Sequence, residues 1–140
     1  MFTIGSLDSE VLTFWETNAP SFEERYEALK LAYNMNYQVS ISAEPILQKN
    51  VEELVEKLSP FVTKNIWIGP AQNLIKRLKS NGYGDPLTLQ KADELIKWQN
   101  DPQFIQYLYD TYKDNPMIRW KYDYLKEMSK IEKMRYQNKK

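Results

Sequence analysis

The sequence predicts an α/β fold with three parallel strands and βα units, followed by a helical C-terminal part. Three short runs, at residues 2–6, 39–43 and 65–69, have the apolar or alternating character of strands. Two amphipathic segments lie between these runs, and each follows a residue type that caps helices. Strands that are joined by crossover helices pair in parallel, so this order predicts a parallel sheet.

The first half of the chain supplies the two crossover helices. The first is expected over residues 21–34, because Ser21 stands three residues before Glu24, the spacing of a capping box, and an apolar stripe follows. The second is expected over residues 50–60, where Asn50 also has an acidic residue three positions later. The first strand begins almost at the first residue of the sequence.

The second predicted strand is polar on one face. Successive side chains of a strand point to opposite faces. One face therefore carries Val39, Ile41 and Ala43, and the other carries Ser40, Ser42 and Glu44. A central parallel strand is usually apolar on both faces. The pattern thus indicates either a polar barrel lumen or ligand groove, or an edge strand with one face in water.

The C-terminal part, residues 81–140, is expected to be a helical extension beside a first unit of residues 1–80. A turn-rich break at residues 81–86 separates the two. The extension is rich in Tyr and Trp, and helical spacing favours their packing in a core or an interface over stacking on bases. Three helical segments are expected, near residues 89–96 and after the N-cap–proline pairs Asp101-Pro102 and Asn115-Pro116.

The composition excludes several kinds of site. The chain has no cysteine and no histidine, which removes thiolate catalysis, iron–sulfur ligation and most zinc sites. Its 19 basic and 19 acidic residues balance, so no overall attraction to nucleic acid or to an anionic membrane is expected. No targeting signal and no membrane-spanning run is visible, and a cytoplasmic protein is expected.

In parallel α/β folds the ligand site forms at the carboxyl ends of the strands. Ser6 and Asp8 follow the first strand, where they either bind ribose hydroxyls or cap a loop or helix. Gly69 follows the third strand, where it either lets a ligand approach the backbone or serves the turn before Pro70. No phosphate loop or dinucleotide glycine motif is present.

Two stretches of the chain carry a family resemblance: FTIGSLDSEVLTFWETNAPSFEERYEALKLAYNMNYQVSISAEPIL and SPFVTKNIWIGPAQNL. They resemble the second half of a radical S-adenosylmethionine (SAM) enzyme barrel, especially in branches related to spore photoproduct lyase. The resemblance covers about residues 2–78, and residues 16–26 and 39–47 carry most of it.

The resemblance implies a half TIM-type barrel that contains strands four, five and six of the parent enzyme. In that family a reduced [4Fe–4S] cluster cleaves SAM to a 5′-deoxyadenosyl radical. The family's three-cysteine motif is missing, so the chain alone is expected to be inactive, as a fragment, a split gene product or a truncated relative. No residue is implied to be catalytic or to bind metal. The matched positions imply SAM contacts from Ser6, Ser40, Ser42, Glu44, Gly69 and Asn73.

Two other functions stay open from the sequence. The barrel remnant could be a scaffold whose aromatic tail binds a protein, or the chain could be a nucleotide-binding domain without catalysis. The expected partner is the missing N-terminal half-barrel, or a second copy that pairs with the open edge of the first strand. A tail helix folded over that edge is the alternative to self-association.

Overall fold

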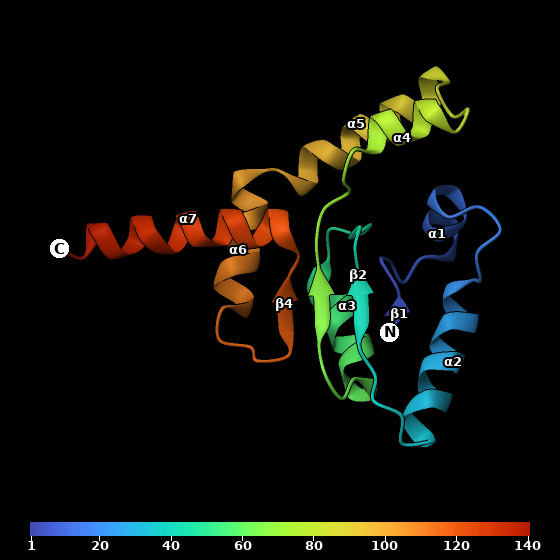
Figure 1. Ribbon diagram of the computed structural model, residues 1–140, viewed down its shortest axis with the longest axis horizontal. Coiled ribbons are helices and arrows are strands. Elements are labelled where there is room, and N and C mark those ends of the chain that lie inside the picture. Colours follow the sequence, from blue (N-terminus) through green and yellow to red (C-terminus); the bar gives the residue numbers. More distant parts are fainter.

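Four short strands form one parallel sheet, and they follow one another across it in chain order (Figure 1). The computed structural model describes residues 1–140. The α/β class and the parallel pairing of the three predicted strands are confirmed. Each is shorter than the run that predicted it, because the chain leaves the regular ladder where the loops begin. The strands are β1 (Phe2–Thr3), β2 (Ile41–Ala43), β3 (Ile66–Ile68) and β4 (Ile118–Trp120).

Seven α-helices connect and flank the strands. They are α1 (Ser9–Trp15), α2 (Phe22–Asn34), α3 (Val51–Leu58), α4 (Leu74–Ser80), α5 (Pro86–Gln99), α6 (Pro102–Tyr112) and α7 (Tyr122–Asn138). The expected capping box of Ser21 and Glu24 is present, and Asn50 caps α3. Helix α1 was not expected from the sequence. None of the helices is both long enough and apolar enough to cross a membrane.

The segment after Asn115 forms a strand, so the expected helix start at Asn115-Pro116 is wrong. The side chain of Asn115 accepts a hydrogen bond from the backbone N–H of Met117 (2.9 Å), which closes a turn. Strand β4 then pairs in parallel with β3. The physical reason is long-range pairing: Ile118 stands in register with Ile66, which stands in register with Ile41, and all three side chains are buried.

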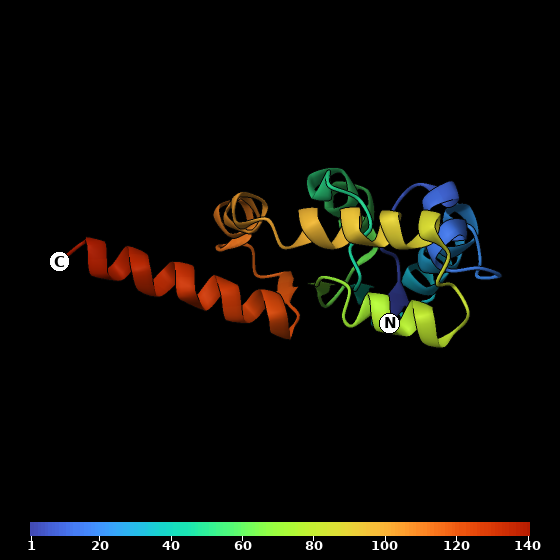
Figure 2. The same ribbon diagram turned by 90° about the horizontal axis from the view of Figure 1, so that it is seen from above.

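Helices cover one face of the sheet. In Figure 1 helix α3 lies behind the strands, and Figure 2 places α3, α5 and α6 on the same side of the sheet. The side chains on this face are buried, among them Ile41 and Ile66, which are fully shielded from solvent and belong to one cluster with Leu54 of α3. That apolar cluster contains residues from Ile4 to Ile131, so the chain before and after residue 80 shares one core.

No helix crosses the other face of the strands (Figures 1 and 2). Strand β2 pairs with β1 on one side and with β3 on the other, so the interpretation of its polar face as part of an edge strand is wrong. Side chains on neighbouring strands in register form a row across this face. The row consists of Thr3, Ser42, Trp67 and Arg119.

Helix α7 leaves the body beside β4 and points away from β1 (Figures 1 and 2). Its buried residues Tyr124, Met128 and Ile131 join the core, and the helix lies next to α6. The expectation that a tail helix folds over the open edge of the first strand is therefore wrong. The physical reason is that β4, which precedes α7, extends the sheet at the opposite edge.

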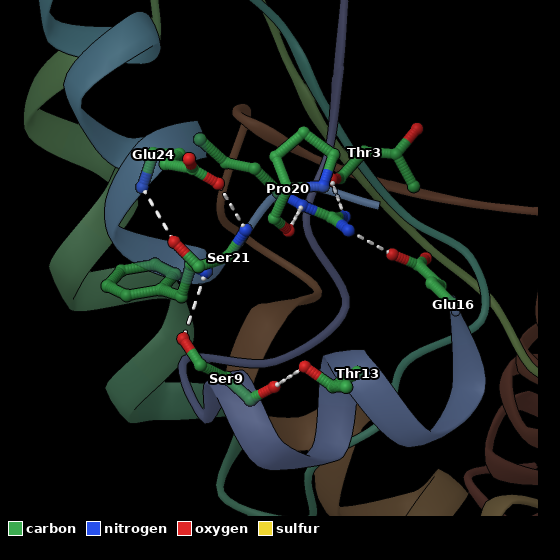
Figure 3. A network of polar contacts seen from close by, with 9 residues as sticks. Thr3, Ser9, Thr13, Glu16, Pro20, Ser21 and Glu24 are labelled. Atoms are coloured by element: carbon green, nitrogen blue, oxygen red, sulfur yellow. Dashed lines mark hydrogen bonds and ion pairs between the residues drawn. The ribbon is translucent and has the colours of Figure 1, made fainter. Parts of the chain in front are cut away.

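Helices α1 and α2 are joined by the hydroxyl group of Ser9. It donates a hydrogen bond to the Glu23 carboxylate (2.7 Å). It also accepts one from the backbone N–H of Phe22 (3.0 Å), drawn as a dashed line in Figure 3. The hydrogen bond from Ser9 is the main reason that the pKa of Glu23 lies below its ordinary value, with smaller contributions from its own backbone and Ser21.

Replacing Ser9→Ala should raise the pKa of Glu23 towards its ordinary value. A lowered folded-state pKa stabilises the fold at neutral pH, and this contribution is lost as the pH falls through the lowered pKa. The variant should therefore lose less stability on acidification than the wild type. Carboxyl NMR titration and acid unfolding measure both effects. Thr13→Ala, which removes the neighbouring hydroxyl of α1, is the control, and an unchanged Glu23 pKa in Ser9→Ala would contradict the assignment.

Candidate functional site

The carboxyl ends of the strands meet at one edge of the sheet, where their loops are held together by backbone hydrogen bonds. The N–H of Leu47 donates to the carbonyl of Gly5 (2.8 Å), and that of Ile46 donates to the carbonyl of Gly69 (2.9 Å). These bonds join the loop after β2 to the loops after β1 and β3. The short ladder of the sheet is thus extended through residues that have no regular strand geometry.

A buried glutamine, Gln99 at the end of α5, fixes two of these loops from the side. Its side-chain amide donates to the carbonyl of Ile46 (2.6 Å) and accepts from the backbone N–H of Ala71 (3.0 Å). Its own carbonyl accepts from the Tyr124 hydroxyl (2.8 Å). Burial raises the pKa of this phenol, which keeps the hydroxyl protonated and able to donate. Gln99 is fully shielded from solvent.

A second glutamine connects the loops after β1 and β2. The side-chain oxygen of Gln48 accepts a hydrogen bond from the backbone N–H of Leu7 (2.7 Å), and its nitrogen donates to the carbonyl of Asn50 (2.7 Å). Asn50 in turn caps α3. The loops around the strand ends are therefore positioned by side chains and do not depend on the strands alone.

Glu44, at the carboxyl end of β2, lies beside Lys121 from the end of β4. The Lys121 Nζ is 3.8 Å from the Glu44 carboxylate and 5.4 Å from the centre of the Trp67 ring. Between them is Gly69, where an added Cβ would lie only 2.6 Å from the Cβ of Lys121. Glycine is needed at this position because the Lys121 side chain packs directly against the backbone.

A cavity of about 690 Å³ opens at this edge, above β2 and β3. Its volume is in the range of small-molecule sites. Glu44 lies in its wall beside the loop after β3, and Arg77 of α4 is a cationic wall residue. Aromatic side chains come from two other elements: Trp15 ends α1 and Tyr83 follows α4. Glu16, directly after α1, adds a second carboxylate, so the cavity combines two carboxylates, one guanidinium and flat apolar surfaces.

The structure separates the six predicted site residues. Ser6 is fully buried, and its hydroxyl accepts from the backbone N–H of Asp8 (3.0 Å). Asp8 caps α1 by accepting from the N–H of Glu10 (2.8 Å), so its carboxylate has the capping role that the sequence left open. Ser40 directly precedes β2 and Ser42 lies within it, so both come before Glu44 along the strand.

The other two predicted residues lie in the loop after β3. Gly69 packs against Lys121, as described above. Asn73 is exposed and has a positive φ of 52° at the N-cap of α4, without a side-chain capping bond. Of the six, only Glu44 is in the wall of the cavity.

Sequence reasoning missed the residues that helices and β4 bring to this edge. Trp15, Arg77 and Tyr83 reach the cavity only because α1, α4 and α5 pack over the strand ends, and nothing in their local sequence marks this. Lys121 had a weak signal, since the alternation from Ile118 to Lys121 matches a strand. The proline before it favoured a helix start instead.

The residues present do not fit an iron–sulfur cluster. The chain has no cysteine, and no group of three carboxylate or other metal-binding side chains converges. They do fit a nucleoside-sized ligand, because the cavity offers a carboxylate that can accept two hydrogen bonds and aromatic surfaces for a base. Comparisons of the chain with protein-family models, curated proteins and solved structures find no match.

Replacing Gln99→Leu should destabilise the fold by about 3 kcal/mol, because it leaves the N–H of Ala71 and the carbonyl of Ile46 without partners. Gln90→Leu is the matched control: Gln90 is exposed on the same helix and bonds only Glu94. Denaturant unfolding measures both variants. Equal stability of the two would show that the Gln99 amide does not hold the loops.

Replacing Gly69→Ala should destabilise the fold by about 1 to 3 kcal/mol, because the new methyl group overlaps the Lys121 side chain. The second change Lys121→Gly should recover most of this loss, since it removes that side chain at an N-cap position that tolerates glycine. A double-mutant cycle in denaturant measures the coupling. Gly84→Ala, whose added Cβ would meet only Cγ of Lys79 at an ordinary contact distance of 3.8 Å, is the control. Additive effects of the two changes would refute the contact.

Proposed function

We propose that this chain is the adenosyl-binding half of a radical SAM barrel, and that it is catalytically silent by itself. The observation that carries the proposal is the placement of Glu44. Its carboxylate lies in the wall of a cavity of about 690 Å³ at the carboxyl ends of two central parallel strands. Ligands of parallel α/β folds bind at this place. A cytoplasmic parent enzyme is part of the proposal.

The architecture supports the half-barrel interpretation in two ways. Helices α3, α5 and α6 lie on one side of the sheet, as helices do around a barrel wall (Figure 2). The opposite face is polar along the central strand β2, with Ser42 in a row between Thr3 and Trp67. In the proposed parent enzyme this face would look into the barrel lumen, and a missing N-terminal half-barrel would complete the wall beside β1.

The chain's own residues would bind and orient the adenosyl group. The Glu44 carboxylate would accept both hydroxyl protons of a ribose diol. Trp15 and Tyr83 would contact the base, and Arg77 would favour a ligand that carries an anionic group. Bound SAM would supply the radical chemistry. The cluster that this chemistry needs would be held by cysteines outside this chain.

An interaction module is the second candidate, and the shape of α7 favours it. This helix extends beyond the body of the molecule (Figures 1 and 2). It also exposes large apolar side chains: Tyr122 (72%), Leu125 (51%), Met134 (57%) and Tyr136 (65%). A partner protein could cover these side chains without any use of the cavity.

Titration with 5′-deoxyadenosine and with SAM tests the proposal. The amide NMR signals of Glu44, Gly69 and Trp15 should move together, with millimolar affinity of about −4 kcal/mol, because the contacts of the cluster to SAM are absent. Glu44→Gln should weaken binding several-fold by removing one strong acceptor. Glu56→Gln, on the exposed side of α3, is the control. If only the signals of α7 move, or if no signal moves, the proposal of adenosyl binding is rejected.

A further inference from the structure

The sheet ends at two edge strands, β1 and β4. An unpaired strand edge is a template for a strand from another chain. At β1, the N–H of Phe2 donates to the carbonyl of Ser40, just before β2 (2.9 Å), and the N–H of Ile4 donates to that of Ser42 in β2 (3.0 Å). Because the direction of backbone groups alternates along a strand, the N–H and carbonyl of Thr3 face the open edge.

The open carbonyl of Thr3 is occupied by Arg25 of α2. One terminal nitrogen of the guanidinium donates to this carbonyl (2.8 Å), and Nε donates to the carbonyl of Pro20 (2.9 Å). The other terminal nitrogen forms an ion pair with Glu16 (Figure 3). The Arg25 side chain is only 10% exposed, so three acceptors and the surrounding packing fix its position.

The local structure around Arg25 is rigid for reasons independent of the sheet. Arg25 follows directly after the capping box of Ser21 and Glu24, in which each side chain bonds the backbone N–H of the other (Figure 3). Ser9 ties the same helix start to α1. The guanidinium therefore reaches Thr3 from a fixed helix end.

The other edge has a similar arrangement. Arg119 donates to the carbonyls of Ile118 (3.2 Å) and Pro116 (2.9 Å), and the N–H of Ile118 bonds the carbonyl of Asn115 (3.3 Å). The outward backbone groups of Ile118 on β4 are thus also occupied. At each edge of this short sheet, an arginine of the same chain thus occupies one outward-facing carbonyl.

We infer that Arg25, by occupying the carbonyl of Thr3, prevents the β1 edge from pairing with a strand of a second copy of this chain. The inference rests on the contacts of Arg25 and goes beyond the proposed function, because the missing half-barrel, like a second copy, would pair fully with β1 only after Arg25 releases the carbonyl of Thr3. A strand from a second copy can accept and donate hydrogen bonds at Thr3 only after the guanidinium releases the carbonyl. That release breaks a hydrogen bond from a charged donor, which is stronger than the neutral bond that replaces it.

Self-association of the Arg25→Ala variant tests whether Arg25 prevents strand pairing at β1. The wild type should be monomeric, and the variant should associate at least about tenfold more tightly, since a charged hydrogen bond no longer competes with strand pairing. Arg135→Ala is the matched control, because Arg135 of α7 forms an ion pair with Asp110 of α6 (2.7 Å) and not with a strand. Sedimentation over a range of concentrations measures association, and circular dichroism verifies the fold.

A second change identifies the surface that associates. In Arg25→Ala combined with Thr3→Pro, proline removes the N–H that faces the open edge and leaves the bonds to β2 intact. This double variant should return to the monomer. Association that persists in it, a monomeric and folded Arg25→Ala, or a wild type that pairs through β1 would each overturn the inference. If Arg25→Ala does not fold, self-association is measured for Arg25→Lys instead. Lysine can pair with Glu16, but its single ammonium group lacks the second terminal nitrogen with which the guanidinium also reaches Thr3.

Discussion

The buried amide of Gln99 is the constraint on which the carboxyl edge of the sheet depends. The strands themselves have only two or three residues each, so their ladders fix little of the chain beyond them. Gln99 bonds the loops after β2 and β3 at once, and its own carbonyl receives the hydroxyl of Tyr124 from α7. A helix from the second half of the chain thereby positions loops from the first half. When every hydrogen-bonding atom of a buried polar group has a partner, the group favours one arrangement of the surrounding loops. Any other arrangement would leave at least one of these atoms without a hydrogen bond.

This dependence also explains how the cavity keeps its shape. Its walls come from α1, from two strand-end loops and from α4 and α5, and no single element supplies more than a part. The loops are rigid because Gln99, Gln48 and backbone bonds between Leu47 and Gly5 hold them to one another. A carboxylate such as Glu44 is useful for binding only when its position is fixed before the ligand arrives.

Local signals in the sequence were sufficient for elements that are stabilised locally. The capping box of Ser21 and Glu24 and the cap at Asn50 need only neighbouring residues, and both were predicted. Strand β4 was missed because its stability comes from β3, about fifty residues earlier in the chain. Its proline at position 116 satisfied the local rule for a helix start, and tertiary pairing overrode that rule.

The same distinction applies to the candidate site and to the sheet edges. The alternation along its own strand placed Glu44 on a polar face at the strand end, and the family resemblance implied its ligand contact. The structure places it in the wall of the cavity. Lys121 and Arg77 were not predicted, since they meet the site only through packing of distant segments. Arg25 combines both situations: its helix start is visible in the sequence, but its contact with Thr3 requires the sheet. A side chain that contacts an element distant in the sequence gains its role only when the chain folds. A local sequence pattern therefore says little about such a residue, and the structure is needed to identify its role.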